Sequence, residues 1–115
     1  MTPTQLFKSL ADDIRIKSLM LIHLEKELCV CELMVALNDS QPKISRHLAQ
    51  LKKSGILIDR KQSQWVYYRI NPNLADWAKQ VIDHTTSANT EFLHSSLNNL
   101  MTMGDRPERL KNCCE

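Results

Sequence analysis

The chain has 115 residues, of which 43% are apolar and 24% charged, and its formal net charge is +2. This balance predicts a compact globular domain and excludes a disordered chain. The sequence has two glycines, Gly55 and Gly104, so it has no Gly-rich phosphate-binding loop, and the common nucleotide-binding motifs are excluded.

The chain start and the cysteines indicate the compartment. No apolar run approaches the roughly 20 residues that a membrane span needs, and the opening residues lack the basic start and apolar stretch of a signal peptide. The cysteines are Cys29, Cys31 and the adjacent pair Cys113 and Cys114, whereas a disulfide-stapled secreted domain would scatter more of them. We therefore expect a cytoplasmic protein with no membrane partner, whose thiols are available to soft metals.

Positive charge is concentrated in one quarter of the chain. Residues 41–69 contain seven cations and one acid, Asp59, for a net charge of +6, while the rest of the chain carries −4. Such segregation is typical of a protein that binds a polyanion through one face. Charge alone would equally describe a solvated surface, so the hydrophobic periodicity has to separate the two interpretations.

The first half of the chain predicts three helices and a short strand. Apolar spacing predicts one short helix after Pro3 and a second from about residue 13 to 24. Residues 28–31 alternate like a strand. A brief helix from residue 32 to about 37 follows, and Asn38 and Asp39 suit the turn that closes it.

The next helix has one apolar and one polar face. It begins near Asp39 or Ser40, with Pro42 tolerated in the first turn, and Gly55 suits its left-handed C-terminus. An apolar stripe at i, i+4 and i+7 predicts the buried face, and the polar residues project on the other side. The stripe is Ile44, Leu48 and Leu51, and the polar face is Lys43, Arg46, Gln50 and Lys53.

A hairpin and a long helix complete the predicted elements. Residues 56–60 and 65–70 are rich in β-branched and aromatic residues and flank a polar, basic tip. A helical pattern then runs from residue 74 to about 103, which, if continuous, would form a helix about 45 Å long at 1.5 Å per residue. So long an apolar stripe predicts a homodimer that packs through this helix and the short N-terminal one. Residues 1–103 would form one domain, and residues 104–115 a mobile tail.

This order of elements predicts a mainly α fold with a small β-hairpin wing, a winged helix-turn-helix. Its second helix would enter the DNA major groove, and the wing would lie along the backbone. A symmetric dimer would then meet half-sites roughly 34–36 Å apart on an inverted-repeat operator. Candidates for base contacts are Gln41, Lys43, Ser45, Arg46 and Gln50. Candidates for phosphate contacts are Lys52, Lys53, Arg60 and Lys61.

Single members of this set are weak predictions, because any one polar residue is more often solvated than in contact with a base. The prediction rests on the whole set. His47 lies at the edge of the apolar stripe, and we interpret it as a packed, hydrogen-bonding structural histidine.

Cys29 and Cys31 form a candidate site for a thiophilic ion. Two residues apart in a helix they are separated by about 200° of rotation, whereas in extended backbone they share a face. One ion bound by both would therefore require non-helical backbone and would compete with DNA for the local geometry. Cys31 lies near the expected helix N-terminus, where the dipole favours thiolate. An isolated C-x-C is more often two buried small hydrophobes.

The surrounding residues favour the metal site. Three runs of the sequence appear in a characteristic order: Glu27-Leu28-Cys29-Val30-Cys31-Glu32-Leu33, Asp39-Ser40-Gln41-Pro42-Lys43-Ile44-Ser45-Arg46-His47-Leu48 and Asp59-Arg60-Lys61-Gln62. By these runs the chain, from about residue 6 to 82, resembles the ArsR family of metal-sensing winged-helix repressors, and most closely its arsenical-resistance branch. The resemblance implies a homodimer that represses an arsenic-resistance operon and leaves its operator when trivalent arsenic or antimony binds Cys29 and Cys31. It implies no organic cofactor and no enzymatic activity.

One position departs from that branch. Met34 stands where a third cysteine is common, and a neutral thioether is a poor substitute for a thiolate. Either the thiol pair suffices with an exogenous thiol, or Cys113 or Cys114 supplies the third sulfur. The alternative interpretation of Cys113 and Cys114 is an unliganded surface tail.

Three other hypotheses stay open. Other branches of the family sense zinc or related ions through acids and histidines of the last helix, which Asp83, His84 and His94 resemble only faintly, so we interpret them as surface residues. A small thiol redox enzyme is the alternative from a different class, but no C-x-x-C motif lies in a βαβ context and no nucleophile elbow is present. The third is a DNA-binding regulator without a ligand, in which the cysteines only pack.

Overall fold

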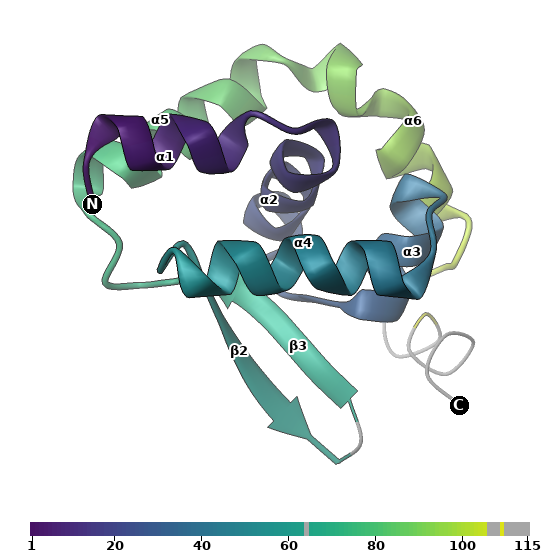
Figure 1. Ribbon diagram of the computed structural model, residues 1–115. Helices are drawn as coiled ribbons and strands as arrows, with labels where there is room; N and C mark the ends of the chain where they lie inside the picture. Colours follow the sequence, from purple (N-terminus) through teal and green to yellow (C-terminus); the bar gives the residue numbers. More distant parts are fainter. Residues whose placement is uncertain (64, 106–108, 110–115) are drawn as a thin grey trace.

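The computed structural model describes residues 1–63, 65–105 and 109, so most of the expected tail lies outside the described residues. It is mainly helical with a β-hairpin, as predicted (Figure 1). The elements in chain order are α1 (Pro3–Leu10), α2 (Asp13–Glu25), β1 (Leu28–Cys29), α3 (Val30–Leu37), α4 (Gln41–Lys53), β2 (Leu57–Gln62), β3 (Trp65–Ile70), α5 (Asp76–Ala88) and α6 (Thr90–Met101).

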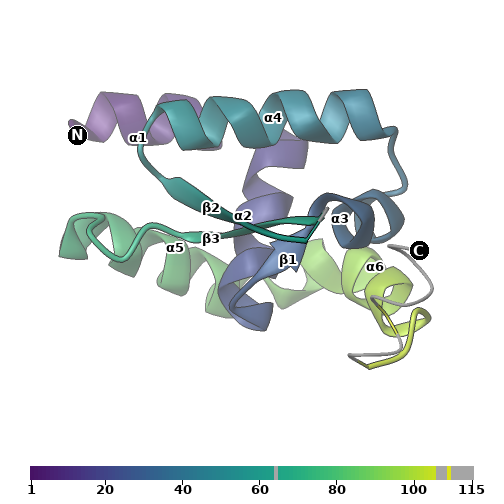
Figure 2. The same ribbon diagram turned by 90° about the horizontal axis from the view of Figure 1, so that it is seen from below.

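Helix α2 lies at the centre of the molecule. Figure 2 shows α1 and α4 along one side and α5 and α6 along the other, with α2 between them. Residues 19–22 of α2 are fully buried, because a helix surrounded by other elements buries apolar side chains on more than one face. In the described part of the chain, no helix has the length and apolar character that a bilayer crossing requires.

The three strands form one antiparallel sheet in the order β1-β3-β2. The hairpin of β2 and β3 is the predicted wing, and its strands pair from Leu57 opposite Ile70 to Gln62 opposite Trp65. The pairing of β1 with β3, which places Cys29 opposite Tyr67, was not predicted. It brings the cysteine segment against the base of the wing.

The predicted boundary between strand and helix at residues 28–31 is wrong. The strand ends at Cys29 and helix α3 already begins at Val30, so Cys31 lies in the first helical turn. Cys29 is the N-cap residue, with extended backbone at φ −92° and ψ 166°. The Glu32 carboxylate accepts a hydrogen bond from the Cys29 N–H at 3.0 Å, and this capping contact explains the earlier helix start.

The turn and helix that follow confirm their predictions. Asn38 adopts the left-handed conformation after α3, and Ser40 is the N-cap of α4, with Pro42 in the first turn. Gly55 has a φ of +83°. The N–H of Gly55 donates to the Lys52 carbonyl and that of Ile56 to the Leu51 carbonyl, which is a Schellman ending.

The predicted single helix from residue 74 to 103 is wrong. It is divided at Asn89, whose φ of −131° and ψ of 45° lie outside the helical region. The Asn89 side chain donates to the Thr85 carbonyl at 2.9 Å and the Thr86 hydroxyl to the Ile82 carbonyl at 2.7 Å. Short polar side chains that bond nearby backbone groups compete with helix continuation.

Helix α6 turns back and packs against α3. Asn99 donates to the Ala36 carbonyl at 3.1 Å, and Leu93 and Leu100 are both 1% exposed. Part of the apolar stripe that was expected to need a second chain is therefore covered within the same chain.

Candidate nucleic-acid interface and thiol cavity

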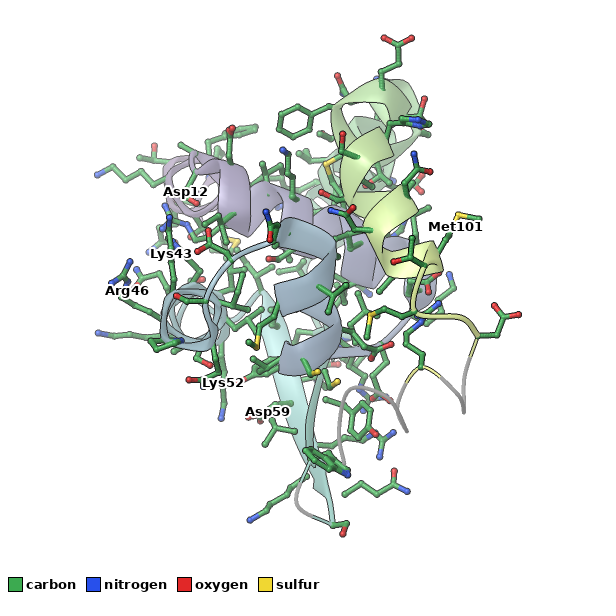
Figure 3. The ribbon with its side chains drawn as sticks, turned by 90° about the vertical axis from the view of Figure 1, so that its right-hand side faces the viewer. Asp12, Lys43, Arg46, Lys52, Asp59 and Met101 are labelled. Carbon is green, nitrogen blue, oxygen red and sulfur yellow. The ribbon has the colours of Figure 1, made fainter. Side chains whose placement is uncertain are left out.

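The outer face of α4 carries the predicted base contacts. Ile44, Leu48 and Leu51 are fully buried, which fixes the rotation of the helix. Lys43 and Arg46 point outward from α4 (Figure 3). Gln41, Lys43, Arg46, Gln50, Lys52 and Lys53 are exposed, and Ser45 is partly buried.

Several of these polar groups have partners within the chain. Lys43 lies 3.3 Å from Asp39, and Lys52 lies 3.0 Å from Asp59. These are surface ion pairs of small net stability, so they constrain the side chains only weakly. In the described ranges neither Lys53 nor Lys61 forms an ion pair.

Arg60 is held more firmly than the other predicted phosphate contacts. Its Nε donates to the Glu27 carboxylate at 2.7 Å and its Nη2 donates to the other oxygen of the same group. The guanidinium also lies 4.7 Å from the Tyr67 ring centroid. The hydrogen bond to Glu27 raises the pKa of Arg60 above its ordinary value. The side chain ties the wing to the segment before β1.

His47 is the structural histidine that the sequence predicted. It is 9% exposed, and its Nδ1 lies 3.3 Å from Arg15 Nη1 and 3.9 Å from Asp12 Oδ1. Both partners belong to the start of α2, so His47 joins α4 to the segment that follows α1.

Cys29 and Cys31 line one cavity of about 250 Å³. Cys29 is 2% exposed, and Cys31 is partly buried. The sequence argument required extended backbone through both residues, but one extended residue at the N-cap suffices to place both on the same cavity. The remaining lining residues are Val30, Met34, Gln41, Trp65 and Val66.

The cavity joins the two predicted sites. Gln41 is the first residue of α4 and borders the same cavity as the two cysteines. Its side-chain amide also donates to the Ser45 hydroxyl at 2.7 Å. Sequence reasoning missed Gln41, Trp65 and Val66 as neighbours of the thiols, because the strand pairing that brings β3 here joins residues far apart in the chain.

The described residues contain no group of three or more His, Cys, Asp or Glu side chains that could hold a metal ion. Met34 lines the cavity as the third sulfur, while Cys113 and Cys114 lie outside the described residues. Asp83 pairs with His23 at 2.9 Å, and His94 contacts Asn98 at 3.1 Å. These contacts support the interpretation of Asp83 and His94 as ordinary surface residues.

A buried carboxylate adjoins Cys29 and Cys31 and was also missed. Glu32 is 0% exposed, and Arg109 Nη1 lies 3.1 Å from it and 2.8 Å from Glu25. Burial by itself would lower the pKa of Arg109, but the hydrogen bonds to the two carboxylates outweigh it and the pKa is raised. An acid between Cys31 and Leu33, at the start of an apolar helix, was the sequence signal for a buried partner.

Comparison with known proteins agrees with the geometry. Residues 12–59 match the family model described as bacterial regulatory protein, arsR family. The chain is 53% identical over 113 residues to the arsenic resistance transcriptional regulator ArsR2 of Pseudomonas putida, covering 98% of each chain. It is 49% identical over 98 residues to the arsenical resistance operon repressor of Escherichia coli, covering 85% of this chain and 84% of that one.

A solved structure supports the fold assignment. HlyU from Vibrio cholerae superimposes with a TM-score of 0.68 at 31% identity, covering 76% of this chain and 90% of that chain. The winged helix-turn-helix prediction is thereby confirmed, and the thiol-enzyme alternative is set aside because the relatives are transcriptional regulators. The chain belongs to the ArsR family of bacterial DNA-binding transcriptional regulators.

Proposed function

We propose that the protein is a homodimeric repressor of an arsenic-resistance operon, released from an inverted-repeat operator when trivalent arsenic or antimony binds Cys29 and Cys31. The observation that carries this proposal is the shared cavity of the two cysteines and Gln41, the first residue of the DNA-reading helix. The names of its relatives, which include an arsenical resistance operon repressor, support the same inducer class.

The donor chemistry fits a soft, thiophilic inducer. Thiolates are the ligands that soft metal ions prefer, and Cys31 lies in the first turn of α3, where the helix dipole would favour the thiolate form of the reduced residue. In a cytoplasmic location, which we also propose, the thiols would be kept reduced. Cys29 and Cys31 would hold the inducer.

Coupling to DNA follows from the position of Gln41. An inducer in the cavity would contact the N-terminus of α4, and the bond from Gln41 to Ser45 would carry the change along the face that meets the bases. Because the inducer and DNA favour different positions of the same helix end, binding of one weakens binding of the other.

We propose two sources for the third sulfur ligand of the inducer, beside Cys29 and Cys31. Met34 is a weak ligand, so an exogenous thiol would complete the site, or Cys113 or Cys114 would do so. Arg109 contacts Glu32 beside Cys31, and Cys113 follows it by four residues. That separation spans at most about 13–14 Å, which supports the tail as a source.

Dimerisation is supported by apolar side chains that the chain leaves exposed. Phe7 of α1 is 52% exposed, Trp77 of α5 37% and Phe92 of α6 43%. Large exposed aromatic groups are typical of residues that pack at an interface. We propose that residues 1–103 form the DNA-binding and dimerisation domain, which pairs through the N- and C-terminal helices.

Fluorescence anisotropy of the protein's own promoter fragment tests this function. Arsenite, antimonite and zinc are titrated into the complex formed by the wild type, by Cys29→Ser and by Cys31→Ser. Arsenite and antimonite should release the wild type, while both variants should bind DNA normally and stay bound. A Cys113→Ser, Cys114→Ser double variant measures whether the tail supplies the third sulfur.

Two results would contradict the proposal. Equal release of the wild type and both serine variants by arsenite would remove the thiol pair from the sensor. Release by zinc that needs neither cysteine would instead assign the protein to the divalent-metal branch. DNA binding that no added ion weakens would leave a regulator without this inducer.

A further inference from the structure

Arg109 joins the two ends of the segment that contains Cys29. Its Nη1 donates to Glu25, the last residue of α2, and to Glu32, in the first turn of α3. Between these acids lie β1 and the N-cap of α3. We call Arg109, Glu25 and Glu32 the Arg109 triad.

Glu32 connects the triad to the backbone of Cys29. One carboxylate oxygen accepts the Arg109 guanidinium at 3.1 Å and the other accepts the Cys29 N–H at 3.0 Å. The side chain is 0% exposed. Removing one partner of a buried ion pair weakens the compensation of the remaining charge, so loss of Arg109 favours a Glu32 side chain that turns toward water and releases the Cys29 N–H.

The same segment contains an unusual backbone conformation. Lys26, between α2 and β1, has a φ of +74°, a region that residues other than glycine rarely adopt. Such conformations persist where the surrounding structure holds them in place. Arg109 spans this residue through its bonds to Glu25 and Glu32, so it is placed to hold the strained connection.

Access to Cys29 is limited by its burial. Cys29 lines the cavity, but the residue is only 2% exposed, so a reagent that bonds its sulfur needs the side chains around it, or this segment, to move into a locally open form. The rate of such reactions rises with the population of that form. Contacts that stabilise the closed segment therefore slow reagents that attack Cys29.

We propose that Arg109 is a positioning residue for the thiol pair: it holds the Cys29 backbone through Glu32 and so limits how fast a trivalent arsenical reaches the site. The part that concerns the arsenical rests on the proposed function, whereas the effect on Cys29 does not. Arg109 itself contacts no inducer.

The test compares Arg109→Gln, Arg109→Lys and the matched control Arg69→Gln, an exposed arginine on β3, in the reduced full-length protein. Amide hydrogen exchange of Cys29 is measured by NMR, and its alkylation by N-ethylmaleimide is followed by mass spectrometry. Arg109→Gln should speed both about tenfold, the effect on Cys29 of losing the charge-assisted hydrogen bond to Glu32. Arg109→Lys should restore most of the protection, and Arg69→Gln should match the wild type.

A second measurement uses arsenite and the emission of Trp65, which lines the cavity. Association of arsenite should be faster in Arg109→Gln than in the wild type. If arsenite fails to release the wild type from DNA while Cys29 exchange still accelerates in Arg109→Gln, the proposed function fails and the positioning role stands. Unchanged Cys29 exchange and alkylation in Arg109→Gln would overturn the positioning role. Equally faster hydrogen exchange at the buried Leu21 amide in Arg109→Gln would also overturn it, since exchange there reports global unfolding.

Discussion

Arg46, like Lys53 on the same helix, has no ion pair within the described residues. Lys43, one turn earlier, pairs with Asp39. Arg46 is exposed on the outer face of the helix, and an unpaired guanidinium presents two donors that match the O6 and N7 acceptors of guanine. Among the candidate residues it is therefore the best placed to read a base.

Replacing Arg46 with Ala should weaken operator binding by about 1–3 kcal/mol if the contact is bidentate. Affinity for random DNA of the same length should fall much less, because phosphate contacts dominate non-specific binding. Anisotropy titrations on both DNAs measure the two effects. An equal loss on operator and random DNA would show that Arg46 contacts phosphate and no base.

Asp12 connects stability to pH at the N-terminus of α2. Burial raises its pKa, but the N–H bonds from Arg15 and Ile14 and the nearby His47 outweigh it and hold the pKa below the ordinary value of 3.8. A carboxyl group whose pKa is lower in the folded state than in the unfolded state stabilises the fold at pH values above its unfolded-state pKa. This stabilisation is lost as the pH falls through the folded-state pKa.

Asp12→Ala should lower the unfolding free energy at neutral pH by about 1 kcal/mol, the usual cost of losing an N-cap. Asp12→Asn keeps the capping oxygen and should lose less. Urea denaturation measures both, and the gap between the wild type and Asp12→Asn should close as the pH falls through the folded-state pKa of Asp12, which lies below 3.8, because the native carboxyl is then protonated. A gap that persists in acid would contradict a charge effect.

At the scale of elements, the C-terminus of α4 depends on one backbone conformation. Gly55 has a φ of +83°, and a Cβ added there would meet nothing within 4 Å. A substitution therefore changes only the conformational cost of the left-handed backbone, with no steric clash. The wing begins two residues later at Leu57, so this turn sets where the hairpin leaves the helix.

Gly55→Ala should destabilise the protein by about 1 kcal/mol, since a left-handed conformation costs an L-residue roughly that amount. Gly55→Asn should cost less, because asparagine tolerates this region. Urea unfolding should show a lower midpoint with an unchanged slope. A wild-type midpoint in Gly55→Ala would contradict the conformational argument.

The broken C-terminal helix shows what periodicity leaves undecided. Both α5 and α6 keep an apolar stripe at the helical period, so the pattern continues across Asn89 without a visible interruption. The break depends on side chains of Thr86, Ser87 and Asn89 bonding carbonyls one turn earlier, and on the surface that α3 offers to α6. Neither effect is visible in hydrophobic spacing.

At the scale of the whole molecule, the charge of +6 on residues 41–69 is spread over α4 and the wing. Lys53 is exposed and unpaired among the described residues, whereas Arg60 is bonded to Glu27. A cation that already has an anionic partner is partly neutralised and attracts a phosphate less strongly. The two residues should therefore contribute unequally to the salt dependence of DNA binding.

Lys53→Gln should reduce the slope of log affinity against log salt by about 1, the value for one lost phosphate contact. Arg60→Gln should change the slope by clearly less. Operator affinities measured from low to moderate salt give both slopes. A larger change in Arg60→Gln would show that its ion pair with Glu27 breaks when DNA binds.

The sequence by itself determined the local elements and the type of protein. Apolar spacing in α4, the left-handed positions at Asn38 and Gly55 and the β-branched wing depend on neighbours a few residues away, so their patterns sufficed. The ordered motifs around Cys29, Cys31 and Arg46 sufficed for the family. Sequence patterns could not give the first residue of α3, because its N-terminal cap depends on the hydrogen bonds that the buried Glu32 carboxylate accepts.

Tertiary structure decided what surrounds the thiols. The pairing of β1 with β3, the cavity shared with Gln41 and Trp65, and the contact of Arg109 with Glu32 all join residues distant in the chain. Hydrophobic spacing reports which face of an element is buried and says nothing of what it is buried against. Long-range packing alone therefore places the C-x-C motif in a cavity at the N-terminus of α4.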